Sequence, residues 1–485
     1  QRDVMAAQIL ALQATVSGLT GNGGITTQLH GSGTTNPKNW FAKAMKFMEE
    51  RARMPMVLTY RAVGSGTGQQ EFVGNAASSG KSYNDFGAGD IPMSKAYYDQ
   101  LMAATPAQAM LHLPFALGAI GIFHNVPSGD LGGAALQLDA CTLAKIFSGV
   151  ITTWNDPAIK TQNPNIKVPA NQLIMVGHRT LGSSSTGGLA GYLDKKCKAS
   201  WDKGTGGLVA WPTSAGFTAV EGSPGMQTFI KDNVYSIGYL DAGQGHDFNI
   251  PEVALTNLDG KTRNSKQSIA LGGVAEAGNQ GIANFPADAS ADWSGVDIYD
   301  MAGDSTWPIV LVSYMYVKKD QTATDPQTAA ALKAFIRTIL QNYDNLCQEN
   351  DFTPPSTALK NLALLAADTI KYPSGMMSFE FETDTAAYTG MGANTISMKR
   401  WSFDDYERSI LKAQIVDLSA KVDMGAAPAA APAAAESSSG DAGLVVGIIA
   451  NIVSVVSIGV STFALMKARG STKGEASASA TMIGA

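Results

Sequence analysis

Charged residues are scarce in this chain of 485 residues, at 16% of the sequence, and they form no basic region. The 35 lysines and arginines are spread along the chain and are outnumbered by 41 acidic residues, which gives a net charge of −6. A nucleic acid is a polyanion, so a protein that binds one needs a concentrated basic face. We therefore expect no nucleic-acid partner.

Cysteine is also scarce: Cys141, Cys197 and Cys347 are the three in the chain, and no two of them form a C-x-x-C pair. The five histidines are scattered rather than set at the spacing of metal ligands. We therefore expect no metal site and no cofactor. In an extracellular protein three cysteines make one disulfide and one thiol, and we expect Cys141 to pair with Cys197.

One long uncharged run lies near the C-terminus. Residues 442–466 are 25 positions without a charge. At about 1.5 Å per residue such a helix crosses a hydrocarbon core of roughly 30 Å. Lys467, Arg469 and Lys473 follow the run, and basic residues favour the cytoplasmic side. We expect a single-pass plasma-membrane protein whose N-terminal part is extracellular and whose tail, residues 467–485, is cytoplasmic.

Small residues recur along this predicted span at 4-3-4-3-4 spacing, which places them on one face of the helix. Such a face lets a second helix approach closely. We therefore expect self-association or a partner transmembrane protein through this face. It consists of Gly443, Gly447, Ala450, Ser454, Ser457 and Ser461.

The remainder of the chain divides by its patterns. Residues 27–375 alternate apolar, strand-like runs with helical stretches, which is typical of an α/β fold with sites at loops after strand ends. Residues 1–26 form an N-terminal extension, and we expect Gln1 to be a mature end left by processing. Residues 376–424 combine a short edge strand with a helix capped by Ser402.

The helix of 376–424 carries an apolar stripe. Its spacing of 4-3-4 is compatible with a coiled-coil stalk, and equally with packing back on the globular domain. Residues 425–441 are rich in alanine, proline and serine, which predicts an extended linker suited to O-glycosylation. The sequence has no Asn-x-Ser/Thr sequon. The stripe consists of Leu411, Ile415, Leu418 and Val422.

Four loops rich in glycine, serine and threonine stand out in the α/β region. Three of them open helices: LHGSGTTNP at 29–37, VGSGTGQQEF at 63–72 and VGHRTLGSSSTGGLAGYL at 176–193. The fourth, NDFGAGDIPMS at 84–94, follows a strand-like FGA. Backbone amides in such loops and at helix N-termini bind oxyanions. Arg179 supplies a full positive charge, so we expect a site for one tetrahedral anion.

Asp90, in the fourth loop, restricts which anion fits. An ionised carboxylate only accepts hydrogen bonds, so it repels a fully ionised oxyanion and favours one that still carries a proton. Hydrogenphosphate carries a proton and sulfate does not. The sequence therefore predicts a site for hydrogenphosphate.

With these loops, residues 27–370 resemble the periplasmic phosphate-binding proteins of bacterial uptake systems, including the DING-type proteins. The resemblance extends to IFSGVITTWNDPAIKTQNPNIKVP at 146–169, YSIGYLDA at 235–242 and DSTWPIVLVSYMYVKKDQ at 304–321. It implies an α/β fold of two lobes, the type II periplasmic-binding-protein fold, joined by a hinge.

The resemblance also implies how the lobes are arranged. We expect the chain to cross between them near residues 111–123 and 307–317. The first lobe is then about 27–115 with 305–375, and the second about 116–304.

The binding residues implied by the resemblance include Asp90 as proton acceptor and Arg179 as the cation. The chain departs from the family at three positions. Leu181 stands where an acidic residue often orients the arginine, Asn36 replaces an apolar residue, and Ser184 stands where glycine is common. The implied set is Thr35, Asn36 through its amide, Ser65, Asp90, Arg179, Ser183, Ser184 through its amide, and Ser185.

No motif indicates catalysis. There is no G-x-S-x-G motif, and we expect His178, beside the clustered serines, to be structural. We therefore expect a membrane-anchored, extracellular phosphate-binding protein, not an enzyme, that captures or senses phosphate or forms part of a surface assembly. The alternative is a structural or interaction module of a cell-surface complex that reuses the fold without a ligand.

Overall fold

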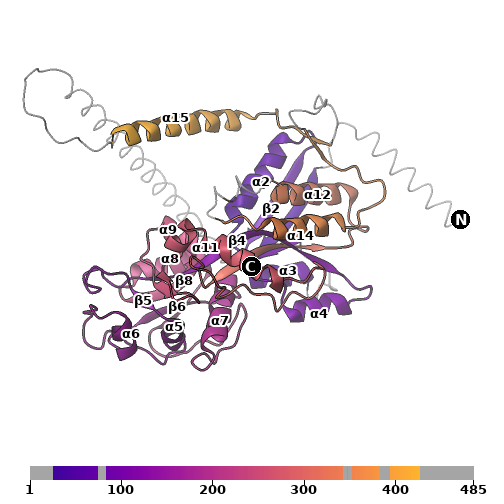
Figure 1. Cartoon of the computed structure of the whole chain (residues 1–485). Helices are drawn as coiled ribbons and strands as arrows, with labels where there is room; N and C mark the ends of the chain where they lie inside the picture. The colour runs from indigo at the N-terminus through magenta and orange to yellow at the C-terminus, as the bar shows by residue number, and fades with distance from the viewer. Residues whose placement is uncertain (1–25, 75–83, 342–346, 348–351, 383–393, 426–485) are drawn as a thin grey trace, which may run out of the picture. The chain divides into compact units, whose positions relative to one another are not determined.

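The computed structural model describes residues 26–74, 84–341, 347, 352–382 and 394–425 (Figure 1). The chain divides into two compact units, Gln1–Asp405 and Tyr406–Ala485. Several predicted segments lie outside the described residues. They are residues 1–25, residues 426–441 of the linker, the predicted span 442–466 with its small-residue face, and the tail, residues 467–485. In the described ranges, no helix combines the length and apolar character that crossing a membrane requires.

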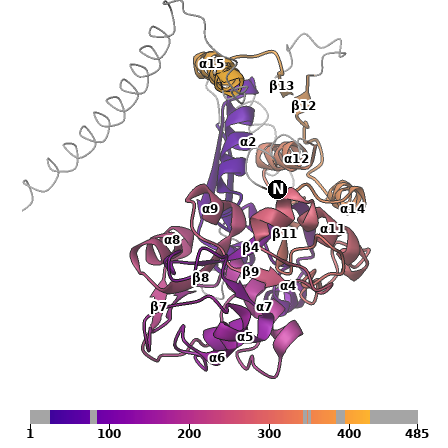
Figure 2. The same ribbon diagram turned by 60° about the vertical axis from the view of Figure 1, so that its left-hand side comes forward.

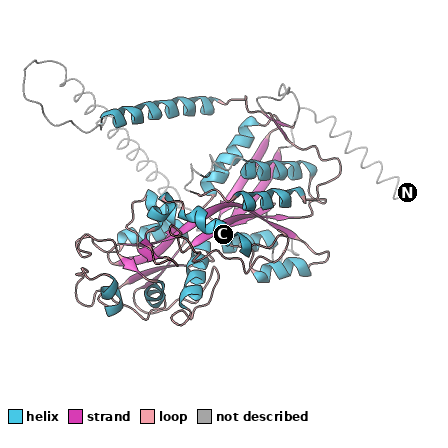
Figure 3. Cartoon of the chain, viewed as in Figure 1, coloured by secondary structure: helices cyan, strands magenta, loops and turns pink. Residues whose placement is uncertain are grey.

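A sheet of eight strands forms the centre of the first unit (Figure 3). The two ends of the sheet consist of parallel strands, which are joined through antiparallel strands in the middle. In spatial order the strands are β2 (Met56–Ala62), β1 (Thr27–Gly33), β3 (Phe86–Gly89), β11 (Val310–Lys318), β4 (Met110–His124), β8 (Ser236–Asp241), β6 (Met175–Arg179) and β7 (Phe217–Val220).

Strand β4 joins the two ends of the sheet. All 15 of its residues are buried, and its first part pairs with β11 from Met110 to Ala119. Its second part pairs with β8 from Ile120 to His124. Both β4 and β11 lie in the segments predicted to cross between lobes. The two-lobed α/β fold is therefore as expected, while the exact lobe limits stay predictions.

Helices gather in two groups, one at each end of the sheet (Figures 1 and 2). Helices α2 and α12 pack on the parallel strands β1 and β2, whereas α7 and α8 pack on β8. The first group is α2 (Lys38–Arg51), α3 (Ser65–Val73), α4 (Lys95–Ala103), α12 (Pro326–Gln341) and α14 (Thr357–Asp368). The second group comes from the chain between β4 and β11, with α5 (Ala140–Phe147), α6 (Pro157–Gln162), α7 (Ser184–Cys197), α8 (Gly222–Asp232), α9 (Ala242–Asp247), α10 (Ser265–Ala270) and α11 (Gly273–Gln280).

Helix α2 illustrates why these segments are helical. Its buried residues fall at the 3.6-residue period of one helix face, which packs on the sheet while charged residues face solvent. Aromatic edge-to-face contacts fix the packing: the Phe41 and Tyr60 ring centroids are 4.9 Å apart. The buried face consists of Trp40, Phe41, Ala44, Met45 and Met48.

The region after residue 375 forms the predicted edge strand and helix. Strand β12 (Glu380–Phe381) pairs in parallel with β13 (Thr395–Ile396). Helix α15 (Phe403–Gly425) follows, and the hydroxyl of Ser402 accepts a hydrogen bond from the Asp405 amide at 3.1 Å. The predicted cap at Ser402 is confirmed.

The predicted disulfide is confirmed. Cys141 lies at the start of α5 and Cys197 at the end of α7, with their Cα atoms 5.2 Å apart. Cys347 is buried and takes no part in this bond. The disulfide therefore ties α7, whose other end carries three of the predicted binding serines, to a neighbouring helix.

Two buried histidines make stability depend on pH. His112 Nε2 accepts a hydrogen bond from the Met93 amide, and His124 Nδ1 accepts one from the Val126 amide, each at 3.1 Å. Burial lowers the pKa of both from 6.5 to about 4. Between pH 6.5 and pH 4 the unfolded chain therefore binds protons at these histidines that the folded chain does not bind. The contribution of the two neutral histidines to stability is present in full above pH 6.5 and is lost as pH falls towards 4.

We expect the free energy of unfolding to fall by about 2 kcal/mol per histidine between pH 7 and pH 5. Urea unfolding at the two pH values measures the change. In His124→Asn the side-chain amide oxygen can still accept a hydrogen bond from the Val126 amide, but the side chain no longer titrates. The loss of unfolding free energy on acidification should therefore be smaller in this variant than in the parent chain by the contribution of one histidine. Equal losses in the variant and the parent chain would contradict this assignment.

Candidate functional site

The ends of β1, β2 and β3 bring three of the predicted loops together. Gly33 ends β1 with φ +152°, and a Cβ atom there would lie 1.9 Å from the Ala88 carbonyl oxygen of β3. Only glycine allows this approach. The Gly33 carbonyl also accepts hydrogen bonds from the amides of Val63 and Gly64, each at 2.9 Å. The loop before α3 is thereby fixed against the loop before α2.

Asp90, directly after β3, is the centre of a hydrogen-bond network and is 2% exposed. Its Oδ2 atom accepts from Thr34 Oγ1 at 2.5 Å, Asn36 Nδ2 at 2.9 Å and Ser184 Oγ at 2.9 Å. Its Oδ1 atom accepts from Ser313 Oγ at 2.7 Å. Four donors from three segments, namely the loop before α2, the start of α7 and strand β11, therefore converge on one carboxylate.

Burial raises the pKa of the Asp90 carboxyl above its ordinary value, and the four side-chain hydrogen bonds act in the opposite direction. Desolvation penalises the charged form, while donors aimed at the carboxylate stabilise it. The Asp90 amide donates to Ser65 Oγ at 3.4 Å, so the hydroxyl of Ser65, a predicted binding residue, contacts the backbone of Asp90.

Arg179 ends β6 and is 5% exposed. Its Nη1 donates to Ser223 Oγ at 3.4 Å, and its Nε is buried without a hydrogen-bond partner among the described residues. Among those residues no carboxylate pairs with it: burial lowers its pKa, and the electrostatic effect of Tyr239 acts in the opposite direction. Arg179 is therefore a buried cation that lacks an anionic partner within the described chain.

The serine run after β6 opens α7. Ser183 precedes the helix, and its amide donates to the Gly207 carbonyl at 2.8 Å. Ser184 and Ser185 occupy the first turn, where backbone amides have no acceptor within the helix. All three residues are buried. This helix end can therefore offer neutral donors to an anion, as the sequence predicts.

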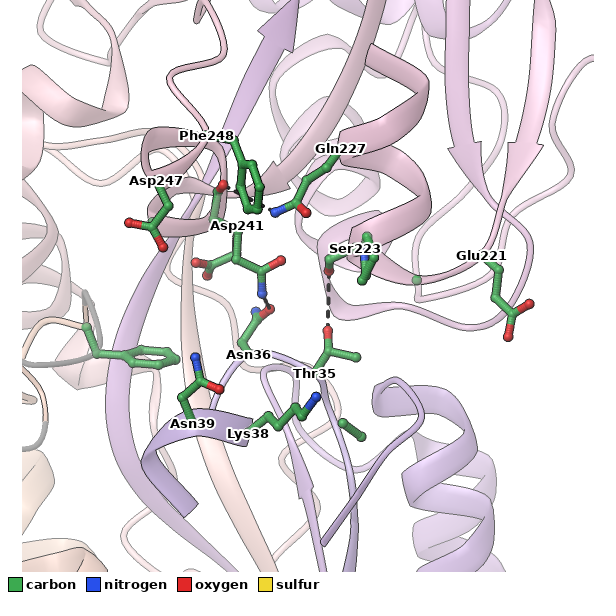
Figure 4. A pocket seen from close by; sticks show the side chains of 16 residues that line it. Thr35, Asn36, Lys38, Asn39, Glu221, Ser223, Gln227, Asp241, Asp247 and Phe248 are labelled. Carbon is green, nitrogen blue, oxygen red and sulfur yellow. Dashed lines mark hydrogen bonds between the residues drawn. The ribbon is translucent and has the colours of Figure 1, made fainter. Parts of the chain in front are cut away.

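Contacts across the cleft close the site on one side. The hydroxyls of Thr35 and Ser223 are 3.3 Å apart, and Gln244 Nε2 donates to Asn36 Oδ1 at 3.2 Å. Figure 4 shows Thr35 and Ser223 facing one another. They line a cavity of about 600 Å³, whose lining also includes Asn36, Lys38, Gln227, Asp241, Gln244 and Asp247. The cavity offers a solvent path to the edge of the polar network.

The predicted residues fall into two linked groups. Asn36, Ser65 and Ser184 meet at Asp90, whereas Thr35 and Arg179 meet at Ser223. Asn36 and Ser184, predicted to act through their backbone amides, also contribute side-chain donors. For Ser183 and Ser185 the structure adds burial and position only.

Three residues of the network were missed from the sequence. Thr34 immediately precedes the predicted Thr35, and Ser313 lies inside the apolar run of β11. Ser223 belongs to EGSPG, a further small-residue loop that opens a helix, and that pattern could have identified it.

His178 and Leu181 lie beside the site without joining the network. The His178 ring stacks on Trp211 with centroids 5.3 Å apart, consistent with a structural role. Leu181 is 50% exposed. In the described ranges, no group of three histidine, cysteine or acidic side chains could hold a metal ion. The arrangement can therefore bind an anion through one cation and several neutral donors.

Comparison with known proteins identifies the family. A sequence model of the PBP superfamily domain matches residues 20–342. The chain is 30% identical over 357 residues to the phosphate-binding protein PstS 3 of Mycobacterium leprae, which covers 73% of this chain and 89% of that protein. It is 28% identical over 332 residues to the phosphate-binding protein PstS of Haemophilus influenzae, which covers 67% and 87% of the two chains.

Solved structures share the fold. A phosphate-binding protein from Stenotrophomonas maltophilia superposes with a TM-score of 0.52 at 18% identity, over 70% of this chain and 94% of that one. A high-affinity periplasmic phosphate-binding protein, PfluDING, solved with phosphate, gives 0.51 at 20% identity, over 69% and 92% of the two chains. At these identities the likeness concerns the fold. The sequence matches, which span two thirds of the chain or more, place this protein in the PBP superfamily, in the family of the phosphate-binding proteins named PstS.

Proposed function

We propose that this protein binds inorganic phosphate, as hydrogenphosphate, between the two lobes of its first unit. The observation that carries the proposal is the state of Arg179: a buried guanidinium with no carboxylate partner in the described chain. Burying an unpaired charge is costly, and an oxyanion would supply the missing partner with charge-assisted hydrogen bonds. The names of the PstS relatives support phosphate as that anion.

The groups around Arg179 favour binding over catalysis. The serines of α7 and the hydroxyls of Thr35 and Ser223 are neutral donors suited to a tetrahedral anion. Asp90 Oδ1 accepts one hydrogen bond from the described chain, so it keeps capacity for the proton of hydrogenphosphate. His178, the nearest histidine in sequence to the serine run, stacks on Trp211 instead of activating a hydroxyl.

Calorimetric titration of the full chain, freed of phosphate, tests the proposal. We expect one phosphate per chain with a dissociation constant of about 1 μM or lower, equivalent to about −8 kcal/mol. Unfolding experiments on the same sample establish that the chain is folded. A folded chain that gives no binding heat and no gain in thermal stability with millimolar phosphate would contradict the proposal.

We further propose that residues 442–466 anchor the protein in the plasma membrane, with the binding lobes outside and the tail inside. The uncharged length of this segment and the basic residues after it support the proposal. Its small-residue face would then pack against another copy or a partner helix. The full chain should stay in the membrane fraction at alkaline pH, and a chain ending at residue 441 should not. Equal release of both would contradict the anchor.

A role in a cell-surface assembly is a second candidate function. Helix α15 favours it, because Leu411, Ile415 and Leu418 are exposed apolar side chains. Phosphate capture within an assembly is compatible with this role. A scaffold without ligand is the remaining alternative, and the titration separates it from a working binding protein.

A further inference from the structure

The acceptor capacity of Asp90 is nearly used up by the chain itself. A carboxylate has about four lone-pair positions, two on each oxygen. Oδ2 accepts three hydrogen bonds, from Thr34, Asn36 and Ser184, so no position remains on it. Oδ1 accepts one, from Ser313, and keeps about one position. A ligand proton can therefore compete for only a small part of this carboxylate.

The Asn36 side chain is held in its donating orientation. Its Oδ1 accepts from Gln244 Nε2 at 3.2 Å while its Nδ2 donates to Asp90 Oδ2 at 2.9 Å. A flipped amide would set two donors against each other on one side and two acceptors on the other. The hydroxyl of Ser184 reaches Asp90 from the first turn of α7, a rigid element buried at this end. Both donors therefore belong to the fixed frame of the site.

We propose that Asn36 and Ser184 set the anion specificity of the site by saturating Asp90 Oδ2. As a result, the site binds fully ionised tetrahedral anions such as sulfate as well as hydrogenphosphate. This inference rests on the proposed function, in which Arg179 binds the anion. Donors on the carboxylate disperse its negative charge, which weakens its repulsion of an unprotonated oxygen. They also occupy lone pairs of the carboxylate that could otherwise accept a hydrogen bond from a protonated ligand oxygen.

The two proposed specificity residues can be changed without removing the other donors. Asn36→Leu replaces the amide with an apolar side chain of similar size, and Ser184→Ala removes only the hydroxyl. Thr34 and Ser313 still hold Asp90 in both variants. Gln244→Ala is the matched control, because it removes the contact across the cleft, while the Asp90 carboxylate, which only accepts, still favours the orientation in which Asn36 donates to it.

The measurement is the ratio of the sulfate to the phosphate dissociation constant, determined by calorimetry on the full chain and each variant. A uniform loss of affinity cancels in this ratio. We expect the ratio to rise about tenfold in Asn36→Leu and in Ser184→Ala, because each change removes a donor that disperses the negative charge of Oδ2. The ratio should rise further in the double variant, in which Thr34 is left as the one described donor on Oδ2 and a lone-pair position becomes free. Gln244→Ala should keep the parent ratio.

Three results would overturn the inference. The first is a parent chain that binds phosphate but does not bind sulfate at millimolar concentration. The second is a ratio that is unchanged or lower in both single variants. The third is a rise in Gln244→Ala as large as in Asn36→Leu, which would assign the effect to lobe closure instead of the donors on Asp90. If the folded parent chain binds neither anion, the proposed function itself fails, and that outcome is distinct from all three.

Discussion

Arg179→Met is expected to lower the affinity for phosphate by about 100- to 1000-fold, because removing one member of a buried charge pair costs roughly 2–5 kcal/mol. Methionine has a similar length and leaves the apolar packing of the side chain largely in place. Arg179 is the residue of the network that carries a full positive charge, and the donors around it are neutral hydroxyls and amides. Calorimetric titration with phosphate measures the loss.

The stability of Arg179→Met separates this account from a purely structural role. The guanidinium is buried, its Nε has no partner in the described chain, and no carboxylate of the described chain pairs with it. Replacing such a group with an apolar one removes a desolvation penalty. The phosphate-free variant should therefore unfold at the same temperature as the parent chain or higher, and a given phosphate concentration should raise that temperature less than it does in the parent chain. A variant that is less stable but still binds phosphate with parental affinity would refute the assignment.

Asp90→Ala is expected to reduce the free energy of unfolding by about 3 kcal/mol or more, because each buried donor left unsatisfied costs roughly 1–3 kcal/mol. Four donors lose their acceptor in this variant: Thr34, Asn36, Ser184 and Ser313. Water entering the vacated space would recover part of the loss. Chemical denaturation of the phosphate-free full chain measures the change.

Asp90→Asn provides the matched comparison for this prediction. Its amide oxygen can keep the crowded Oδ2 position, and its NH2 group then faces Ser313, whose hydroxyl can rotate to accept. We therefore expect Asp90→Asn to lose clearly less stability than Asp90→Ala. Parental stability in Asp90→Ala would mean that the network around the carboxylate contributes little to the fold.

The small-residue loops of this protein could be predicted because their signals are local, whereas the two lobes and the full set of binding residues were implied by the resemblance to phosphate-binding proteins. Glycine-rich turns after apolar runs mark strand ends, and parallel strands bring such turns to one edge of a sheet. That reasoning led to Asp90, Arg179 and the serines of α7 without knowledge of tertiary contacts. The N-cap at Ser402 was predicted on the same local basis.

The missed residues depend on register and on contacts between distant segments. Ser313 contacts Asp90 because β11 pairs antiparallel with β3, which sets Tyr314 opposite Gly89. Nothing in an apolar run distinguishes this serine from one that packs in the core. The adjacent Thr34 and Thr35 contact different residues, because successive side chains point in different directions. Thr34 contacts Asp90 and Thr35 contacts Ser223. Ser223, at the start of α8, contacts Arg179 at the end of β6 and Thr35 in the loop before α2, and both contacts join segments that are distant in the sequence.

The most direct test of the central claim is a crystal structure of the full chain, or of its folded first unit if that proves stable alone, grown with phosphate. The account predicts a tetrahedral anion whose oxygens accept hydrogen bonds from the Arg179 guanidinium and from the first turn of α7, at about 2.7–2.9 Å for the charged contacts. Asp90 should keep its contacts with Asn36 and Ser184. A folded protein in which the anion binds elsewhere, with Arg179 still lacking an anionic partner, would contradict the account.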